Sequence, residues 1–454
     1  MTNTKRQVFP TITQAFLNRV RSQPDRETFF TKEGTQWKGV TWKQFYDNVK
    51  GISLGLTELG SKPGENVCLI SNTRIEWAAA DMAILGSRGV TVPVYASNTP
   101  EETAYIINHC EARFVFVEDA KQLEKVLSIR DKLPKVEKII PFSFVGTPQL
   151  AEQKDLLSLA ALRELGKRAA DQEKFDRNLM EVKPTDIFTI CYTSGTTGVP
   201  KGAVLSFDAL TSEIQDVDKM LASESEDVGE SDTVLSFLPI SHIFGKIESM
   251  AGYHFGWKVY YAESIEKLLG NMAEVGPTML FAVPRIFEKA YSRIKANIDD
   301  SSSSKRNMFD WAMKVGRAYF GKIWAGKKPN LLETAQYQIA RKLVFKKIYA
   351  RFGGRVRFCV AGGAPLPRDI GEFMRICGIT ILEGYGLTET CAAVTVNTLN
   401  EMKYGTIGKP LPEVAIKIAE DGEILVKSRK VFRCYYKSPE ATAEVLDPDG
   451  WFHT

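Results

Sequence analysis

The chain has 454 residues, of which 44% are hydrophobic and 25% are charged, an ordinary composition for a folded protein of about three domain equivalents. Residues 1–10 are polar and basic with no apolar run behind them, which argues against a secretory signal. No window reaches the roughly 18 uncharged apolar residues of a membrane-spanning helix, because Asp81 and Arg88 interrupt the best candidate, residues 77–95. Seven cysteines without a CxxC pair and only four histidines argue against disulfides and metal clusters. We expect reduced, buried thiols in a cytoplasmic protein.

The charge is unevenly distributed along the chain. Residues 285–357 contain 18 Lys and Arg against five Asp and Glu, a local excess of +13 in a chain whose net charge is +4. Solvated helix faces explain such an excess, and so does a surface that meets anionic lipid, where each basic group contributes about 1 kcal/mol. Nucleic acid is the weakest alternative, because no helix-turn-helix, zinc-finger or aromatic RNP pattern accompanies the charge. We predict no nucleic-acid binding.

Strands and helices alternate through the first 141 residues. A helix is expected at 12–22, followed by paired strands at 27–31 and 39–42 around a turn at Gly34. Residues 42–59 have the apolar spacing of an amphipathic helix. The alternation continues with strands at 67–70, 90–94, 113–117 and 138–141 and helices at 75–86, 103–110 and 121–132. This order is typical of a doubly wound, mainly parallel α/β fold.

The pattern changes twice in the remainder of the chain. Residues 148–183 are charged and helical with little apolar content, and we interpret them as a surface excursion. A helix at 207–221, an acidic connection at 223–232 and strands at 233–238, 257–261, 278–281 and 355–360 predict a second parallel sheet, with a flexible serine-rich loop at 298–306. After residue 405, short alternating strands at 414–418, 423–427 and 431–435 predict a small antiparallel barrel.

Residues 192–202, YTSGTTGVPKG, follow the apolar run 186–191 and combine hydroxyls, glycines and a lysine. Gly195 and Gly198 allow positive φ, so that successive N–H groups point at an anion, and Lys201 adds a positive charge. Pro200 and Gly202 exclude a Walker A loop. The segment therefore predicts either a phosphate-binding loop or an ordinary polar turn.

Residues 193–202 are similar to the phosphate-binding signature of the adenylate-forming superfamily, which includes acyl-CoA synthetases, luciferases and peptide-synthetase adenylation domains. Further motifs of that superfamily occur in the expected order: SHIFG at 241–245, AGGAPL at 361–366, EGYGLTE at 383–389 and GWFHT at 450–454. PRIFEK at 284–289 and the run 251–264 resemble bacterial long-chain fatty acid CoA ligases. The resemblance covers essentially the whole chain.

The resemblance implies two doubly wound, mainly parallel sheets layered αβαβα with a small antiparallel β-barrel. We expect a first α/β subdomain at 1–183, a second at 184–404 with the phosphate loop and adenylate motifs, and the barrel at 405–454. Family members continue beyond GWFHT into a ribose-binding aspartate and a small domain. We therefore expect an N-terminal fragment in which this C-terminal small domain is absent and which is nearly inactive alone.

The implied activity is ATP-dependent conversion of a long-chain fatty acid to acyl-AMP, followed by transfer to CoA, with Mg²⁺ as cofactor. Two alternatives stay open: a ligase for another carboxylic acid (aryl, medium-chain or amino acid), and a nucleotide- or acyl-binding module without catalysis. The implied partners are the fatty acid, ATP and CoA. Peripheral contact of residues 285–357 with the inner membrane face, and a homodimer, are further open alternatives.

The resemblance also assigns roles at the nucleotide end. The phosphate cradle comprises Thr193, Ser194, Gly195, Thr196, Thr197, Gly198 and Lys201, and the AMP site comprises Gly362, Gly363, Ala364, Pro365, Glu383, Gly384, Tyr385, Gly386 and Thr388. Glu389, with Thr193 nearby, would bind Mg²⁺, which prefers hard oxygen ligands. The structural alternatives are a helix-capping role for Glu389 and a simple strand-to-helix turn at 362–364. Lys201, His242, Thr388 and Glu389 form the expected catalytic set.

At the acyl end, His242 would line the carboxylate site, and Phe244, Ile247, Tyr253 and Trp257 would line an apolar tunnel. A general base is not expected, because a fatty carboxylate is already ionised at neutral pH. A structural histidine with core side chains around it is the alternative. Lys246 and Glu248 fit neither interpretation.

Overall fold

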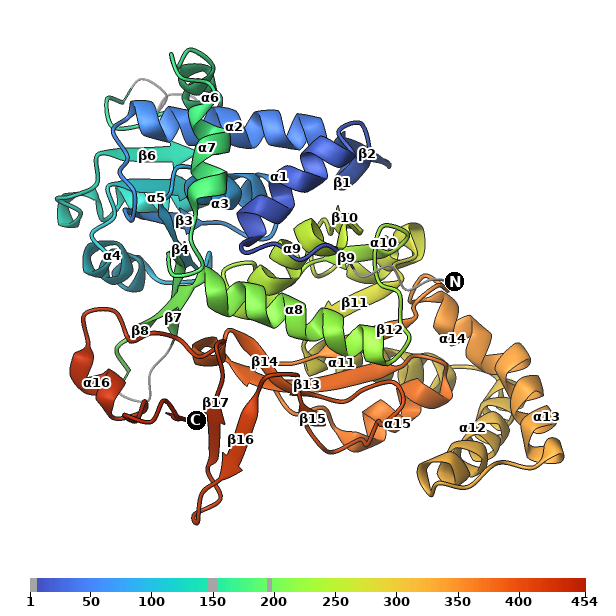
Figure 1. Cartoon of the computed structure of the whole chain (residues 1–454). Helices are drawn as coiled ribbons and strands as arrows, with labels where there is room; N and C mark the ends of the chain where they lie inside the picture. Colours follow the sequence, from blue (N-terminus) through green and yellow to red (C-terminus); the bar gives the residue numbers. More distant parts are fainter. Residues whose placement is uncertain (1–5, 146–152, 194–197) are drawn as a thin grey trace.

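The computed structural model describes residues 6–145, 153–193 and 198–454, in which helices lie between and outside two large sheets (Figure 1). The smaller sheet has six strands in the order β6-β5-β3-β4-β7-β8, and all but β8 are parallel. Their bounds are β3 Asn66–Ile70, β4 Val90–Val94, β5 Phe114–Val117, β6 Lys138–Pro141, β7 Ile187–Thr193 and β8 Lys201–Ser206.

The larger sheet has nine strands in the order β15-β14-β13-β12-β11-β9-β10-β1-β2. The neighbouring strands β13, β12, β11, β9, β10 and β1 are parallel. At one edge of the sheet β14 and β15 pair antiparallel, and at the other edge β2 does. Their bounds are β1 Glu27–Glu33, β2 Gln36–Thr41, β9 Thr233–Ser236, β10 Lys258–Tyr261, β11 Met279–Ala282, β12 Phe358–Ala361, β13 Ile381–Leu387, β14 Ala392–Val396 and β15 Lys409–Pro410.

Three buried clusters give the molecule five layers. The largest cluster joins the facing sides of the two sheets through helices α1 Ile12–Ser22, α2 Trp42–Glu58, α3 Ile75–Gly86, α8 Phe207–Ser223 and α9 Ile243–Phe255. A second lies under α4 Pro100–His109 and α5 Ala120–Leu127 on the smaller sheet, and a third under α10 Leu268–Val275, α11 Pro284–Asp299 and α15 Arg368–Ile376 on the larger one. The αβαβα layering expected from the sequence is therefore confirmed.

Two strand pairs cross the subdomain boundary that we expected at residue 183. β1 and β2 join the larger sheet through β10, although they come early in the chain, and β7 and β8 join the smaller sheet through β4. The hairpin around Gly34 was expected, but a hairpin's own sequence does not indicate which distant strand it pairs with. β8 itself was not expected; it begins within the predicted phosphate loop, at Lys201.

Residues 153–183 are not the surface excursion that we expected. Helix α6 Leu159–Lys167 packs on α2, where a methyl group on Gly166 would lie 1.9 Å from the Gly51 carbonyl oxygen, so the two backbones are in contact. Leu162 on α6 and Phe175 on α7 Lys174–Glu181 are fully buried. Close helix approach through small residues compensates for the low apolar content.

The expected barrel is a three-stranded antiparallel sheet of β16 Ala415–Ile418, β17 Ile424–Lys427 and β18 Phe452–His453. Residues 431–435, predicted as a barrel strand, instead run beside β8, where the Arg433 N–H donates to Val204 O and the Val204 N–H to Cys434 O. The seven cysteines are free and all but Cys434 are buried, as expected.

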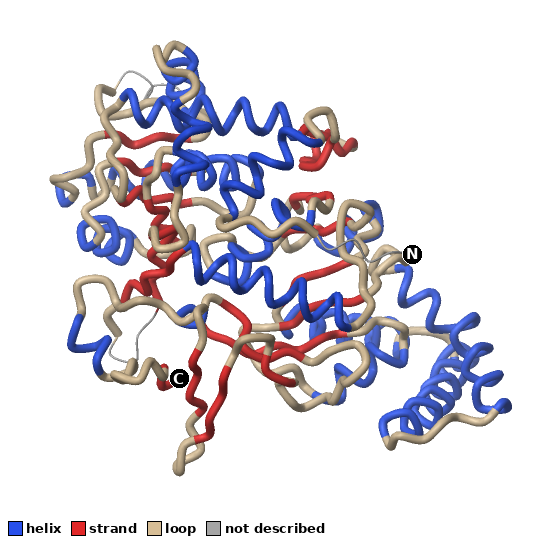
Figure 2. Tube along the Cα trace, in the orientation of Figure 1, coloured by secondary structure: helices blue, strands red, loops and turns tan. Residues whose placement is uncertain are grey.

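A helical arm extends from one end of the larger sheet (Figures 1 and 2). It consists of α12 Ser303–Trp324, α13 Leu331–Ala340, a π-helical turn Arg341–Phe345 and α14 Lys346–Ala350. The expected flexible loop between α11 and α12 is only a short connection. Within the described ranges, no helix combines the length and the apolar content needed to cross a bilayer.

Candidate active site

A cavity of about 570 Å³ runs along β11, β12 and β13 to their carboxyl ends and is closed by α8, α9 and the segment around Tyr435. One part is lined by Thr193, Lys201, Thr388 and Glu389, and the other mainly by apolar side chains of α9 and the sheet. The cavity therefore joins polar groups suited to phosphates with an apolar compartment.

The first polar element is the hairpin of β7 and β8, in which Thr193 pairs with Lys201. Gly198 has φ +84°, as expected for a loop that turns its backbone toward an anion. Four residues predicted to hold phosphate, Ser194, Gly195, Thr196 and Thr197, lie outside the described residues. Lys201 Nζ is 5.3 Å from the centre of the Tyr435 ring, so the lysine is held at the mouth of the hairpin by a cation–π contact.

Glu389 lies in a short 3₁₀ turn, Thr388–Thr390, between β13 and β14. The Tyr435 hydroxyl donates to Glu389 Oε1 at 2.7 Å, and the Phe432 N–H donates to the Glu389 carbonyl at 2.6 Å. Burial, with the bond to Glu389, raises the pKa of Tyr435, so its hydroxyl remains a proton donor. One segment thus holds the backbone of the turn through Phe432 and orients the Glu389 carboxylate through Tyr435.

The backbone at this turn is strained. Cys391 and Ala392 have φ of +53° and +85°, values that non-glycine residues rarely adopt. Gly386 makes the turn possible, since a methyl group there would lie 1.6 Å from the Ala392 carbonyl oxygen. The turn brings Glu389 back toward the cavity, next to Tyr385 and Thr388.

Helix α9 carries the acyl-end residues. His242 caps the helix, where its Nδ1 accepts the Phe244 N–H at 3.1 Å. The ring is open to the cavity, yet the surrounding protein atoms lower the pKa of His242, so the imidazole is neutral at pH 7. Phe244, Ile247, Ala251 and Phe255 follow it along the cavity wall.

A buried ion pair connects the middle of α9 to helix α3. Lys246 Nζ donates to both Asp81 carboxylate oxygens at 2.7 Å, and the Thr91 hydroxyl donates to Asp81 Oδ1 at 2.6 Å. Lys246 and Asp81 are 0% and 1% exposed. The lysine that the motif left unexplained is therefore a link between α9 and α3.

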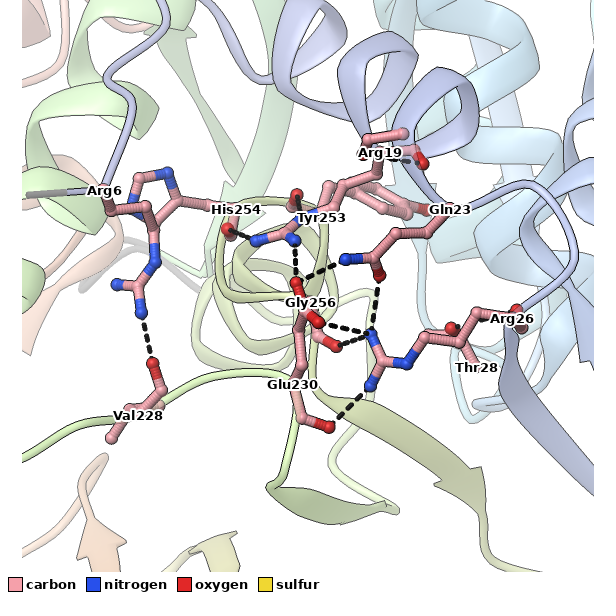
Figure 3. A network of polar contacts seen from close by, with 11 residues as sticks. Arg6, Arg19, Gln23, Arg26, Thr28, Val228, Glu230, Tyr253, His254 and Gly256 are labelled. Atoms are coloured by element: carbon pink, nitrogen blue, oxygen red, sulfur yellow. Dashed lines mark hydrogen bonds and ion pairs between the residues drawn. The ribbon is translucent and has the colours of Figure 1, made fainter. Parts of the chain in front are cut away.

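Two arginines from the N-terminal segment hold the carboxyl end of α9 (Figure 3). Arg19 donates to the His254 carbonyl at 2.7 Å, and Arg26 donates to the Gly256 carbonyl at 2.8 Å. Glu230 pairs with Arg19 at 2.7 Å. Positive groups at a helix carboxyl end satisfy its free carbonyls and oppose its dipole, so these arginines anchor the carboxyl end of the helix that forms this cavity wall.

Comparison with known proteins agrees with this geometry. The model of the AMP-binding enzyme family matches residues 16–436. The chain is 33% identical over 440 residues to long-chain-fatty-acid–CoA ligase FadD15 of Mycobacterium bovis, covering 96% of this chain and 70% of FadD15. It is 33% identical over 457 residues to long-chain-fatty-acid–CoA ligase ACSBG2 of Xenopus laevis, covering 98% of this chain and 60% of ACSBG2.

The chain belongs to the AMP-binding enzyme family.

Solved structures show the same fold. The N-terminal domain of FACL13 from Mycobacterium tuberculosis superposes with a TM-score of 0.71 at 20% identity, covering 98% of this chain and 96% of that one. The adenylation domain of a carboxylate reductase from Mycobacterium chelonae has a TM-score of 0.75 at 21% identity, and the match covers 98% of this chain and 69% of that one.

In this AMP-binding enzyme, most of the predicted and described site residues meet at one cavity. Its lining includes Thr193, Lys201, His242, Phe244, Ile247, Trp257, Gly362, Gly363, Gly384, Tyr385, Gly386, Thr388 and Glu389. Motifs nearly 200 residues apart thus converge as the resemblance implied.

Other predicted residues do not line this cavity. Tyr253 lies on the opposite side of α9, where its ring is 5.3 Å from that of Phe16 in an aromatic core cluster. Glu383 Oε1 instead accepts the Leu366 N–H at 2.9 Å, and burial raises the pKa of that carboxyl. Gly198, Ala364 and Pro365 also lie outside the lining.

The lining residues that were not assigned from the sequence include Glu213, Glu248 and Tyr435. Glu213 Oε2 accepts from Lys430 Nζ at 2.9 Å, in a buried cluster that includes Asp216. Burial raises the pKa of both carboxyls, which Lys430 opposes. Tyr435 carried no motif signal, because its role depends on a contact with Glu389, 46 residues earlier in the chain.

Proposed function

We propose that this chain carries the adenylate site of a long-chain fatty acid CoA ligase, which converts a fatty acid to acyl-AMP and then to the CoA thioester. The continuous cavity carries this proposal, because it places the predicted phosphate groups and an apolar compartment in one space. The names of FadD15 and ACSBG2 support it. An aryl or amino acid pocket would need more polar groups beside α9 than the cavity offers.

In the first step, a carboxylate oxygen of the acid bonds to the α-phosphorus of ATP and the bond to pyrophosphate breaks. Lys201 and the backbone of the β7–β8 hairpin stabilise the leaving charge, and Thr388 donates to the α-phosphate. Neutral His242 adds no charge beside the reacting carboxylate. In the second step, the CoA thiol loses its proton to solvent, its sulfur bonds to the acyl carbon, and the bond from that carbon to the phosphate oxygen breaks, so that AMP leaves.

Glu389 fits the role of a magnesium ligand. Its buried carboxylate lines the polar end of the cavity, and the Tyr435 hydroxyl holds one oxygen. Within the described ranges no group of three or more His, Cys, Asp and Glu side chains surrounds it. A single carboxylate suits Mg²⁺, which retains waters and binds substrate phosphates; when bound, the ion neutralises phosphate charge.

The test is thermal stability of the 454-residue chain with non-hydrolysable acyl-adenylate mimics of increasing chain length. A site occupied at about 100 times Kd adds about 2.7 kcal/mol to the folded state, so we expect a shift that grows with chain length. Ala251→Phe narrows the apolar part and should abolish the gain for long chains only. Ala161→Phe, at an exposed position of α6, is the matched control. No shift with any mimic would refute the proposal.

We also propose that the helical arm contacts anionic membrane. Residues 327–351 contain seven basic residues and one acidic residue. Leu332 and Ile339, 67% and 51% exposed, lie seven residues apart on one side of α13, and Leu343, 45% exposed, follows in the π turn. Exposed leucines flanked by lysines favour the surface of an anionic bilayer.

Vesicle cosedimentation tests this contact. Binding to vesicles with anionic lipid should weaken as salt rises, and Leu332→Ser with Leu343→Ser should remove most of it. Ile418→Ser, at a 64% exposed position of β16, is the matched control. Failure of the unaltered chain to bind at low salt would refute the contact without affecting the adenylate site.

A further inference from the structure

Glu248 is a buried polar residue of α9 that lines the cavity. The residue is 3% exposed, and neither Oε1 nor Oε2 makes a hydrogen bond of ordinary geometry within the part of the chain that the structure describes. An unsatisfied buried polar group costs about 1–3 kcal/mol. Native structures contain few of them, and each calls for an explanation.

Lys246 and Glu248 are two buried polar groups of this helix, and within the described residues only Lys246 is paired. Residues two apart on a helix point in different directions. Lys246 therefore faces Asp81, which satisfies it with two bonds of 2.7 Å, whereas Glu248 borders the cavity. The unpaired group is the one beside the space for a ligand.

The state of the carboxyl defines what it recognises. Burial raises the pKa of Glu248 to about 8, and the Ser236 hydroxyl opposes this shift only in part, so the group is protonated at neutral pH. A protonated carboxyl offers one O–H donor and also accepts. A hydroxyl group, which likewise donates and accepts, is its natural complement, whereas a saturated chain leaves it unsatisfied.

Trp257 adds a second unpartnered group to the same cavity wall. Its indole N–H makes no hydrogen bond in the described ranges. The nitrogen lies against Gly252, one helical turn after Glu248, where an added methyl would come within 3.1 Å of Nε1. Two buried polar groups that make no hydrogen bond among the described residues thus belong to the lining of one cavity.

We propose that the preferred acid carries a hydroxyl group on its aliphatic chain and that Glu248 binds this hydroxyl. The inference rests on the proposed function, in which the cavity holds the acyl chain. Glu248 follows His242 by six residues, about 9 Å along the helix axis. The hydroxyl therefore belongs within the chain, at a distance from the reacting carboxylate.

The experiment measures dissociation constants of acyl-adenylate mimics by calorimetry on the 454-residue chain. All mimics have one chain length; one is saturated, and the others carry a hydroxyl at successive positions. We expect one position to bind about 3- to 10-fold tighter than the saturated mimic, the range of one net hydrogen bond. Glu248→Leu should remove this preference, and Glu248→Gln, whose amide donates and accepts, should retain part of it.

Glu58→Leu, at the exposed end of α2 and outside the lining, is the matched control. Because leucine replaces an unsatisfied polar group, the Glu248→Leu variant should fold, and its binding of the saturated mimic verifies this. The inference is overturned if the saturated mimic binds as well as every hydroxylated one, or if Glu248→Leu keeps the preference; the proposed function survives both results. If no mimic binds, both fall.

Discussion

Replacing Lys246 with methionine should destabilise the protein strongly, although lysine is rarely a core residue. The substitution removes two hydrogen bonds of 2.7 Å to Asp81, a carboxylate that is only 1% exposed. Among the residues that the structure describes, Thr91 then remains the only hydrogen-bond donor to the Asp81 side chain. Breaking a buried ion pair from one side leaves an uncompensated charge and costs about 3–5 kcal/mol.

Urea unfolding measures this cost, and tryptophan fluorescence follows it. The centre of the Trp77 ring lies 5.1 Å from Lys246 Nζ, so Trp77 reports the loss of the structure around this pair. The double variant Lys246→Met with Asp81→Asn removes both charges, so it should recover most of the lost stability. Lys43→Met is the matched control: Lys43 and Asp47 form an exposed i,i+4 pair on α2, worth about 0.3–0.5 kcal/mol.

Two results would refute the reasoning: a single variant within about 1 kcal/mol of the unaltered chain, or a double variant as unstable as the single one. The first would mean that Asp81 finds water or another partner, and the second that Lys246 acts through its packing on Trp77 and Phe188. A further expectation is weaker mimic binding in the single variant, because Lys246 fixes the helix that forms the cavity wall.

Three further predictions concern the other buried contacts. Tyr435→Phe removes the hydrogen bond to Glu389 Oε1, so more Mg²⁺ should be needed to reach half of the thermal shift that ATP produces. Tyr436→Phe, the control, should leave that Mg²⁺ concentration unchanged. Equal concentrations for the two variants would contradict the role of Tyr435 in orienting Glu389. Lys430→Met leaves Glu213 without its cation and Asp216 with only Lys219, at 3.8 Å, so it should destabilise the fold more at pH 8, where both carboxyls must ionise, than at pH 5; urea midpoints at the two pH values decide. For Glu248, the folded pKa of about 8 exceeds the unfolded value of about 4.3, so the folded state retains a proton that the unfolded state releases. Stability should therefore fall as pH rises from 5 to 8, by up to about 1.4 kcal/mol per unit from this group, and Glu248→Gln should show a shallower slope; identical slopes would exclude the shift.

Local patterns predicted most elements because they depend on neighbouring residues. The helix at 42–59 was expected from its apolar spacing, and the structure adds a capping box between Thr41 and Gln44. The parallel strands at 67–70 and 90–94 were recognisable as short apolar runs. Packing by close approach was harder to predict: α6 is buried partly because Gly166 meets Gly51, and glycine carries no hydrophobic signal.

Contiguous motifs likewise indicated much of the site, but not which way each side chain points. Phe244 and Tyr253 were both assigned to the acyl tunnel, yet only Phe244 reaches the cavity, because the other side of α9 packs against Phe16. Lys246 and Glu248 were unexplained in the sequence for the same reason. Their roles depend on which surfaces α9 meets.

The sequence by itself therefore determined the element types, the family and the residues of the phosphate and adenylate motifs, since each is encoded in a short run of neighbours. Only the tertiary structure decided which sheet each hairpin joins, that Tyr435 holds Glu389, and that Lys246 is paired while Glu248 is not. These outcomes depend on contacts between segments about 46 to 230 residues apart, where burial and hydrogen-bond geometry select a partner that no local pattern indicates.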